Sequence, residues 1–364
     1  MKIFFWQNIL SIHQSAFLSA LSEVASVNLI VEKESAEYRQ KEGWSIPNMN
    51  KVVITISPTI NTIRDIIDIE DNAIHVFSGI NAYPQVYQAF KYACSKKRRI
   101  MLYLEPFDWT GLKGSLRWWK YFLLKVYYNP RIAAILPTGE TGCNCYRSVY
   151  FPNQKIFEWG YFTKKQELPS RAVNNHSLPR LLFVGSLDDN KNLMFLLSTL
   201  KTISIPFDSF RIIGRGPLER NIREMIKYDP RINFIGTVSN KIVQQMMTES
   251  DLLILPSKYD GWGAVVNEAL QNGMSVIASE NCGSYVLLDG LQRGEKFNFH
   301  GDNNLKKVLE KWLLKLPLIT SERNDIIQWT DNCISGKSAS EYFLQICNHV
   351  FNNGERPIAP WKKN

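Results

Sequence analysis

The segment KYDGWGAVVNEALQNG, residues 258–273, sets two carboxylates close to a glycine-rich turn. Asp260 lies in the turn itself, next to backbone N–H groups that Gly261 and Gly263 leave accessible to a hydroxyl or a phosphate oxygen. Glu268 follows within a short helix whose other residues are mostly apolar. A buried carboxylate needs hydrogen-bond donors, and the two hydroxyls of a ribose would supply them. In the alternative interpretation Asp260 caps the turn and Glu268 pairs with a neighbouring Lys or Arg.

A second candidate site follows a predicted strand at residues 181–185. The sequence FVGSLDDNKNLMFLL combines a strand end, a loop and the start of a helix, which together favour anion binding, and Lys191 adds a positive charge there. The alternative is a helix capped by Asp189 or Asn190 with an exposed lysine. Farther on, IIGRGPLERNI has only part of a dinucleotide-binding pattern, so its glycines are interpreted as tight-turn residues.

Both halves of the chain alternate apolar runs of strand length with segments of helix length, which predicts parallel sheets built from βαβ units. In the second half the predicted strands are LLFVG (181–185), FRIIG (210–214), INFIG (232–236), LLILP (252–256) and SVIAS (275–279). In the first half they are KIFFW, SVNLIV, KVVITIS, AIHVFSG, RIMLYLE and IAAILP. The expected fold class is therefore α/β, with two doubly wound, Rossmann-like domains.

The polar segment at residues 164–180 contains two prolines and is the predicted linker. We expect an N-terminal domain of residues 1–170, a C-terminal domain of residues 171–335, and a final helix and tail, residues 336–364, that packs back toward the N-terminal domain. Parallel sheets bind ligands at the carboxyl ends of their strands. Two such edges facing each other across a cleft would hold two substrates together.

The composition is that of a globular chain that attracts anions. The 364 residues are 45% hydrophobic and carry a formal net charge of +9, which favours nucleic acid, anionic lipid or a phosphorylated small molecule as partner. No nucleic-acid recognition motif accompanies the charge, so nucleic acid is not the expected partner. The six cysteines are scattered, and Cys143 and Cys145 are too close for a common zinc-binding pair, so reduced thiols in the cytoplasm are expected.

No apolar run is long enough to cross a bilayer, and the N-terminal segment is interpreted as a first strand and helix rather than a signal peptide. Residues 112–131 interleave basic and aromatic side chains, the composition of a helix that lies on an anionic membrane surface. The alternative is a helix packed on its sheet with solvated lysines. We therefore expect a cytoplasmic protein, either soluble or peripheral on the inner face of the cytoplasmic membrane.

Four segments in order, LLFVGSLDDNKN, FRIIGRGP, INFIGTV and SDLLILPSKYDGWGAVVNEALQNGMSVIAS, resemble the donor-binding domain of the retaining family 4 glycosyltransferases of GT-B fold. The resemblance covers roughly residues 180–290. The signature of that family is an acidic residue, seven intervening positions and a glutamate, which here correspond to Asp260 and Glu268. An aspartate thus replaces the first glutamate of the signature.

The resemblance implies a role for each matching residue. Glu268 would bind the nucleotide ribose, Asp260 would hold hydroxyls of the donor sugar, and Lys191 would bind the donor diphosphate. Ser186 stands where the family often has an arginine, so Arg215 or the helix end would have to compensate. The implied donor site comprises Gly185, Ser186, Lys191, Arg215, Gly261, Trp262, Gly263 and Glu268.

The first domain matches the family less closely. Glu105 stands where the family commonly has a histidine, and it would line the cleft and orient donor or acceptor, or else cap the next turn. The N-terminal Gly-Gly loop of the family is absent, which leaves His13 and Gln14 as candidates for acceptor contact. The acidic run DIIDIED at residues 65–71 is interpreted as a solvated face rather than a metal site. Since enzymes of this family generally need no metal, no cofactor is expected.

The resemblance implies a retaining hexosyltransferase with Lys191, Asp260, Glu268 and Glu105 as its catalytic set. The donor would be a nucleotide-diphosphate hexose or N-acetylhexosamine, a UDP-sugar rather than a GDP-sugar. By analogy the acceptor would be a glycan on a polyprenyl diphosphate in O-antigen, capsule or exopolysaccharide synthesis. The alternatives are a nucleotide-sugar-binding protein without transfer activity and a GT-B sugar epimerase.

Overall fold

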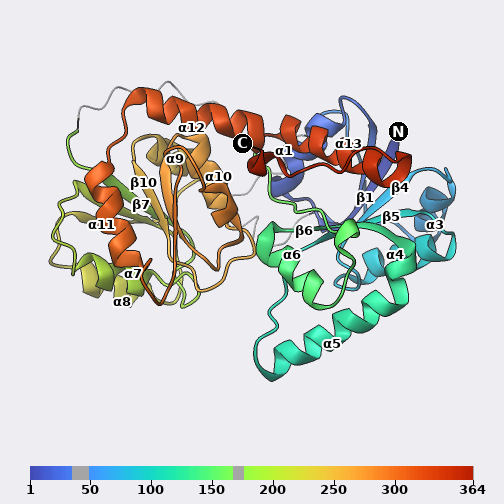
Figure 1. Ribbon diagram of the computed structural model, residues 1–364, viewed down its shortest axis with the longest axis horizontal. Coiled ribbons are helices and arrows are strands. Elements are labelled where there is room, and N and C mark those ends of the chain that lie inside the picture. The colour runs from blue at the N-terminus through green and yellow to red at the C-terminus, as the bar shows by residue number, and fades with distance from the viewer. Residues whose placement is uncertain (35–48, 167–175, 364) are drawn as a thin grey trace. The chain divides into compact units, whose positions relative to one another are not determined.

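The computed structural model describes residues 1–34, 49–166 and 176–363. The chain forms two compact units (Figure 1), one of Met1–Lys164 with Cys333–Asn364 and the other of Lys165–Asn332. The chain therefore leaves the first unit and returns to it at the C-terminal end. The expected boundary between residues 170 and 171 lies outside the described residues.

The first unit contains a six-stranded sheet in the order β3-β2-β1-β4-β5-β6, and every neighbouring pair in it is parallel. This order is that of a Rossmann-type sheet, in which the strand order reverses next to the first strand. The central strand β1 is buried on both faces, as the unbroken run KIFFW predicts. The strands are β1 (Lys2–Ile9), β2 (Ser26–Lys33), β3 (Val53–Ile56), β4 (Ile74–Ser78), β5 (Arg99–Leu104) and β6 (Ile132–Pro137).

Helices cover the first sheet, and Figure 1 shows the first and the last of them side by side. These two helices approach so closely that a Cβ on Gly336 would lie 2.2 Å from the carbonyl oxygen of Ala16. Residues after the second unit thus complete the core of the first. The helices are α1 (Ile12–Leu21), α3 (Ile60–Asp68), α4 (Pro84–Ser95), α5 (Gly111–Tyr128), α6 (Gly139–Ser148) and α13 (Gly336–Asn352).

The second unit repeats the same topology, with six parallel strands in the order β12-β11-β10-β7-β8-β9. Counted from β7, this is again the Rossmann order. The strands are β7 (Arg180–Val184), β8 (Ser209–Ile213), β9 (Ile232–Gly236), β10 (Leu252–Leu255), β11 (Ser275–Ser279) and β12 (Gly294–Phe297). The helices are α7 (Leu193–Leu200), α8 (Glu219–Ile226), α9 (Asn240–Thr248), α10 (Ala264–Gln271), α11 (Leu305–Lys315) and α12 (Thr320–Cys333). The predicted pair of doubly wound sheets is confirmed.

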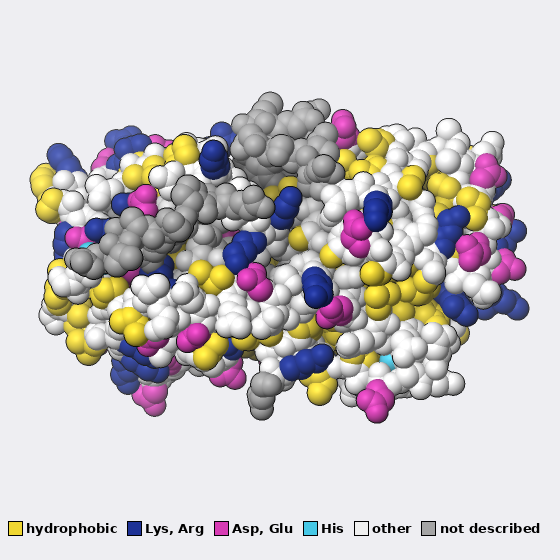
Figure 2. Space-filling model, turned by 90° about the horizontal axis from the view of Figure 1, so that it is seen from above, with side chains coloured by type: hydrophobic (Ala, Val, Ile, Leu, Met, Phe, Trp, Pro, Cys, Tyr) yellow, Lys and Arg dark blue, Asp and Glu magenta, His cyan; other side chains and the backbone are white. Residues whose placement is uncertain are grey.

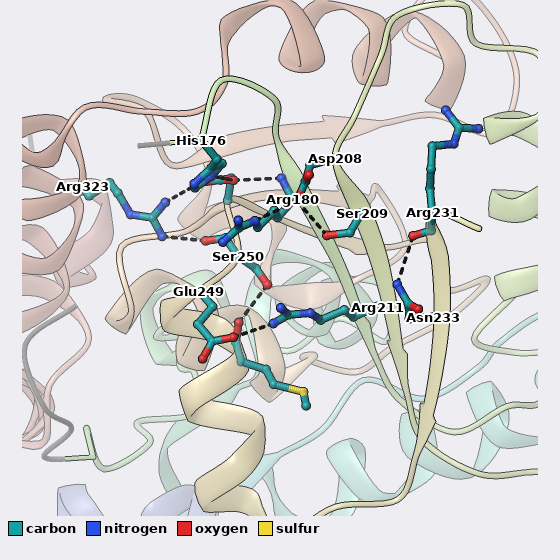
Figure 3. A network of polar contacts seen from close by, with 12 residues as sticks. His176, Arg180, Asp208, Ser209, Arg211, Arg231, Asn233, Glu249, Ser250 and Arg323 are labelled. Atoms are coloured by element: carbon teal, nitrogen blue, oxygen red, sulfur yellow. Dashed lines mark hydrogen bonds and ion pairs between the residues drawn. The ribbon is translucent and has the colours of Figure 1, made fainter. Parts of the chain in front are cut away.

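A buried polar network fastens the amino-terminal edge of the second sheet (Figure 3). Figure 3 labels its members His176, Arg180, Ser250 and Arg323. Asp251, just before β10, is fully buried and accepts hydrogen bonds from the backbone N–H of Arg180 at 2.8 Å and from Arg323 Nη1 at 2.8 Å. Asp251 Oδ2, which accepts the bond from Arg180, also lies 2.7 Å from His176 Nε2. Arg323 belongs to α12 and donates a further bond to the carbonyl oxygen of Ser250. The network holds α12 against the sheet at the edge opposite to the one where ligands bind in such folds.

The surface carries charges of both signs. On the face drawn in Figure 2, Lys and Arg side chains are interspersed with Asp and Glu. Within the described residues, no helix is both long enough and apolar enough to cross a membrane.

Candidate functional site

The carboxyl ends of β7 and β8 lie against each other in the second unit. The N–H of Gly185 donates to the carbonyl oxygen of Ile213 at 3.1 Å, and the N–H of Leu187 donates to that of Arg215 at 2.9 Å. A Cβ on Gly214 would lie 1.8 Å from the carbonyl oxygen of Gly185, so this close approach requires a glycine. The glycines interpreted as tight-turn residues therefore bring the exposed Arg215 next to the loop after β7.

Asp188 folds the loop between β7 and α7. It accepts hydrogen bonds from Ser186 Oγ at 2.7 Å and from the backbone N–H of Lys191 at 2.9 Å. Burial alone would raise the pKa of Asp188, but the bonds from Ser186 and from the backbone of Lys191 and Asn190 hold it below its ordinary value. The serine that replaces the expected arginine thus helps to shape the loop. The side chain that accepts the bond from the loop backbone is that of Asp188, and not that of Asp189 or Asn190 as the capping alternative expected. In the sequence, the only local indication of this role is the serine two residues before Asp188.

The loop after β7 is tied to the loop after β10. The side chain of Asn190 donates to the carbonyl oxygen of Tyr259 at 2.8 Å, and its backbone carbonyl oxygen accepts from the N–H of Lys258 at 2.7 Å. The ammonium of Lys191 forms an ion pair with the carboxylate of Asp260. Both side chains of this pair retain partial exposure, 21% and 16%. The structure therefore brings together two of the predicted catalytic residues at the switch point between β7 and β10.

The turn at residues 260–263 can form only with glycine at its end. Gly263 has φ +84°, and a Cβ there would lie 2.6 Å from Cys282 Sγ and 3.0 Å from Leu255 Cδ2. The side chain of Trp262 points into the core, where it is 1% exposed and donates to the side chain of Asn267 at 2.7 Å. A contribution of Trp262 to binding would therefore come from its backbone.

Asp260 also accepts a hydrogen bond within its own turn. The backbone N–H of Trp262 lies 3.3 Å from Asp260 Oδ1, while the ammonium of Lys191 contacts Oδ2. Asp260 thus caps its own turn, as the alternative interpretation held, and its second oxygen lies in the candidate site. Within the described residues, Lys191 is the cationic partner of Asp260, and Glu268 has no such partner.

Glu268 lies on α10 and faces polar amides of α9. Its carboxyl group is surrounded by protein, although part of the residue is accessible. Burial raises the pKa of this carboxyl to about 7, against the opposing effect of hydrogen bonds from Gln244 and Asn240. The side chain of Asn272 donates to Gln244 Oε1 at 2.7 Å and to the carbonyl oxygen of Glu268 at 2.8 Å, which fixes Gln244 in place. Glu268, the residue predicted to bind the ribose, is thus hydrogen-bonded by two neutral amides.

Asn240 and Gln244 were not found from the sequence. The signal that could have indicated them is their spacing of four residues, which places two amides on one face of α9. Asn240 also accepts a hydrogen bond from the side chain of Gln166 at 3.2 Å. This bond connects the start of the second unit to the surroundings of Glu268.

The predicted residues of the first unit gather around Tyr161. Its hydroxyl donates to the carboxylate of Glu105, which follows β5, and its ring stacks on His13 at 4.8 Å between centroids. The hydroxyl of Tyr146 donates to the backbone carbonyl of Glu105 at 2.9 Å. Gln14 is buried, accepts a hydrogen bond from Gln7 at 2.7 Å, and lines a cavity about large enough for one water molecule. Sequence analysis missed Tyr161 because it lies 56 residues from Glu105.

Within the described residues, no group of His, Cys, Asp or Glu side chains is arranged to hold a metal ion. All six cysteines are free and buried. In the acidic run, Asp68 accepts from the hydroxyl of Tyr92 at 2.6 Å and pairs with Lys96 and Arg98. Hydrogen bonding from Tyr92 is the main reason why the pKa of Asp68 is lowered.

Residues 178–313, which include the whole candidate site of the second unit, match the family model described as glycosyl transferases group 1. The second unit carries a group 1 glycosyl transferase domain. The chain is similar to an uncharacterized 41.2 kDa protein in the cps region of Klebsiella pneumoniae, 29% identical over 167 residues, or 45% of this chain and 44% of the relative. Sulfoquinovosyl transferase SQD2 of Arabidopsis thaliana is 26% identical over 179 residues, or 49% of this chain and 32% of the relative. The chain spans less than half the length of these curated relatives.

Solved structures extend the similarity from the glycosyl transferase domain to the fold of the whole chain. HepE of Anabaena in complex with UDP and glucose superposes with a TM-score of 0.65 at 12% identity, covering 96% of this chain and 99% of HepE. The lipopolysaccharide outer core galactosyltransferase WaaB superposes with a TM-score of 0.67 at 13% identity, covering 97% of this chain and 99% of WaaB. The fold of the chain is GT-B, as predicted.

Proposed function

We propose that the protein is a glycosyltransferase that moves a hexose or N-acetylhexosamine from a nucleotide-diphosphate sugar to a hydroxyl group of a glycan. The observation that carries this proposal is the contact between Lys191 and Asp260 at the carboxyl ends of β7 and β10, inside the group 1 glycosyl transferase domain. A cation and a carboxylate at this edge suit the two parts of the donor, because the diphosphate is anionic and the sugar carries hydroxyl donors.

The proposed mechanism uses these groups for binding and for charge stabilisation. When the donor binds, the ammonium of Lys191 exchanges its contact with Asp260 for one with the donor diphosphate. There it stabilises the negative charge that develops on the departing diphosphate. Asp260 then accepts hydrogen bonds from hydroxyls of the donor sugar, and Glu268 accepts them from the ribose. Burial raises the pKa of the Glu268 carboxyl. Hydrogen bonds from the ribose hydroxyls would oppose this effect, because they stabilise the ionised form.

The reaction proceeds with retention in this proposal. The bond between the anomeric carbon and the diphosphate oxygen breaks, and the acceptor oxygen bonds to the anomeric carbon on the same face. The proton of the acceptor hydroxyl passes to the departing phosphate oxygen. No protein nucleophile or metal ion is required, and the protein contributes orientation and electrostatics. Glu105, held by Tyr161 in the first unit, orients donor or acceptor.

The finer assignments rest on related proteins. Anabaena HepE was crystallised with UDP-glucose, which supports a UDP-sugar donor over a GDP-sugar. The Klebsiella relative lies in a cps region and WaaB acts on lipopolysaccharide, which support a polysaccharide acceptor, carried here by a polyprenyl diphosphate. Six free cysteines are consistent with a cytoplasmic enzyme that meets this acceptor at the membrane surface.

A second candidate function is nucleotide-sugar binding without transfer. The observation that favours it is the bond from Ser186 to Asp188, which places a neutral hydroxyl where the family often has an arginine. A sugar epimerase of GT-B fold is a further alternative. Only a transferase would release nucleoside diphosphate in an acceptor-dependent way, so this release separates it from both alternatives.

The donor class is tested by a thermal-shift panel of nucleotides and nucleotide sugars, since a ligand bound only to the folded state raises the melting temperature. We expect UDP and UDP-sugars to raise it, Glu268→Ala to abolish the shift, and Glu224→Ala, an exposed glutamate on α8, to preserve it. Nucleoside-diphosphate release is then followed with and without glycan acceptors. A melting temperature that no nucleotide changes would contradict the proposal, and release that acceptors do not increase would favour the alternatives.

A further inference from the structure

Helix α5 turns a row of apolar side chains toward solvent. Their relative exposures run from 56% to 89%. They recur at intervals of three and four residues with one adjacent pair, so they lie on one face of the helix. Figure 1 shows α5 along the margin of the first unit. We call this row the outer stripe; it consists of Leu112, Leu116, Trp119, Leu123, Val126 and Tyr127.

The opposite face of α5 is fixed to the core of the first unit. Tyr121 stacks on Phe107 with 4.4 Å between ring centroids, and Trp118 and Phe122 also pack against the core. A Cβ on Gly114 would lie 2.4 Å from the carbonyl oxygen of Trp109, so the preceding loop lies directly on the helix. Because the inner face is already packed, the outer stripe is not a second core-facing surface of this unit.

The charges of α5 are all positive. The segment Gly111–Tyr128 contains three lysines and one arginine and no acidic residue. At 100° per residue, Lys113, Arg117 and Lys120 lie along one flank of the outer stripe, while Lys125 lies on the far side. Arg117 is partly neutralised, since its guanidinium lies 3.6 Å from the carboxylate of Asp108. An apolar row beside a basic flank is the pattern of a helix that lies in the interface of an anionic bilayer.

We propose that the outer stripe of α5 docks on the surface of a bilayer that contains anionic lipid. The apolar side chains enter the boundary between headgroups and acyl chains, and the basic flank contacts lipid phosphates. A second copy of the chain fits this face less well, because an isologous contact would place two basic flanks without acidic partners in one interface. The proposal stands on α5 alone and does not depend on the donor site, none of whose residues lies on this helix.

The test is co-sedimentation of the full chain with vesicles of phosphatidylcholine alone or mixed with phosphatidylglycerol. We expect binding to the mixed vesicles that weakens as salt is added. The double variant Leu116→Ser, Leu123→Ser should bind about tenfold more weakly, because each serine removes apolar area from the contact. The double variant Lys113→Gln, Lys120→Gln should weaken binding to the mixed vesicles and remove most of its salt dependence.

The matched control is Leu314→Ser, which removes a leucine of 76% exposure from α11 in the second unit and should leave vesicle binding unchanged. Thermal unfolding establishes that each variant is folded. The proposal is overturned if the wild type fails to bind mixed vesicles at low salt, or if the Leu116, Leu123 variant binds as well as the wild type. A dimer that this variant abolishes, without vesicle binding by the wild type, would instead assign the outer stripe to a second copy.

Discussion

At the scale of single residues, the candidate donor site combines an ion pair with a carboxyl of raised pKa. Lys191 and Asp260 form an ion pair with each other, so neither charge is buried alone. Glu268 is different, since burial raises the pKa of its carboxyl to about 7 and its side-chain hydrogen bonds come from the amides of Gln244 and Asn240. Such a group is destabilising when ionised and suited to bind hydroxyl donors.

This difference predicts the effect of Glu268→Gln on stability. A carboxyl whose pKa rises from 4.5 to about 7 on folding stabilises the folded state below pH 4.5, and that contribution is lost as pH rises through 7. The loss amounts to about 3 kcal/mol. Glu268→Gln should therefore match the wild type near pH 4 and exceed it in free energy of unfolding near pH 8, while losing nucleotide binding.

Urea unfolding of both proteins at the two pH values measures this effect, with Glu224→Gln as the control for an exposed glutamate. The assignment of a raised pKa would be wrong if the difference between Glu268→Gln and the wild type were the same at both pH values.

The residues named from the sequence are those with a local pattern. Asp260 and Glu268 have a fixed spacing, and Lys191 follows a strand end. Asp188, Asn240, Gln244 and Tyr161 act through contacts that depend on the fold, and Tyr161 lies 56 residues from its partner Glu105. Sequence analysis could therefore predict the charged groups of the candidate site, but not the neutral groups that hold them.

At the scale of elements, the glycine-ended turn before α10 sets the position of Asp260. The N–H of Asp260 donates to the carbonyl oxygen of Asn281, and the N–H of Gly283 donates to that of Asp260, so the turn is held on both sides. Gly263 ends it with a left-handed conformation against Cys282. Gly236 of the second unit has the same backbone conformation but different surroundings, so alanine substitutions at Gly236 and Gly263 can be compared directly.

We expect Gly263→Ala to be more destabilising than Gly236→Ala. Both glycines have φ near +80°, +84° and +81°, so the backbone penalty of about 1 kcal/mol is common to both. A Cβ on Gly263 would lie 2.6 Å from Cys282 Sγ, whereas a Cβ on Gly236 finds its nearest atom, in Phe234, at 3.8 Å. The added overlap should cost about 1–3 kcal/mol more and weaken nucleotide binding.

Chemical unfolding of the two variants gives the comparison directly. Equal losses would mean that the contact with Cys282 does not constrain the turn. Restoration of stability by Cys282→Ala in the Gly263→Ala background would identify the sulfur as the obstacle.

The strands could be predicted from the sequence, whereas the exposed face of a helix such as α5 could not. The buried strands are unbroken apolar runs, because helices cover both faces of each sheet. Helix α7 begins at Leu193, because Asn192 has φ 56° and stands before the first helical residue. The outer stripe of α5 could not be distinguished from its inner face in the sequence, since both faces carry large apolar and aromatic side chains.

At the scale of the whole molecule, both units have the same strand order although the sequence shows no short repeat. The alternation of apolar strands and helices predicts this topology in each half, because right-handed βαβ connections leave few alternatives. The family match covers residues 178–313, and the first unit carries the groups around Glu105 and the outer stripe of α5. We therefore propose that donor chemistry belongs to the second unit, and acceptor contact and membrane docking to the first.

Calorimetric titration of the full chain with UDP tests the central claim, that the carboxyl edge of β7 and β10 binds the donor diphosphate. Lys191→Met should weaken binding about tenfold or more, because it removes the cation from the phosphate site. Lys201→Met, an exposed lysine at the opposite end of α7, should bind as tightly as the wild type. If Lys191→Met binds UDP as well as Lys201→Met does, the diphosphate does not bind at this edge and the assignment of the site is wrong.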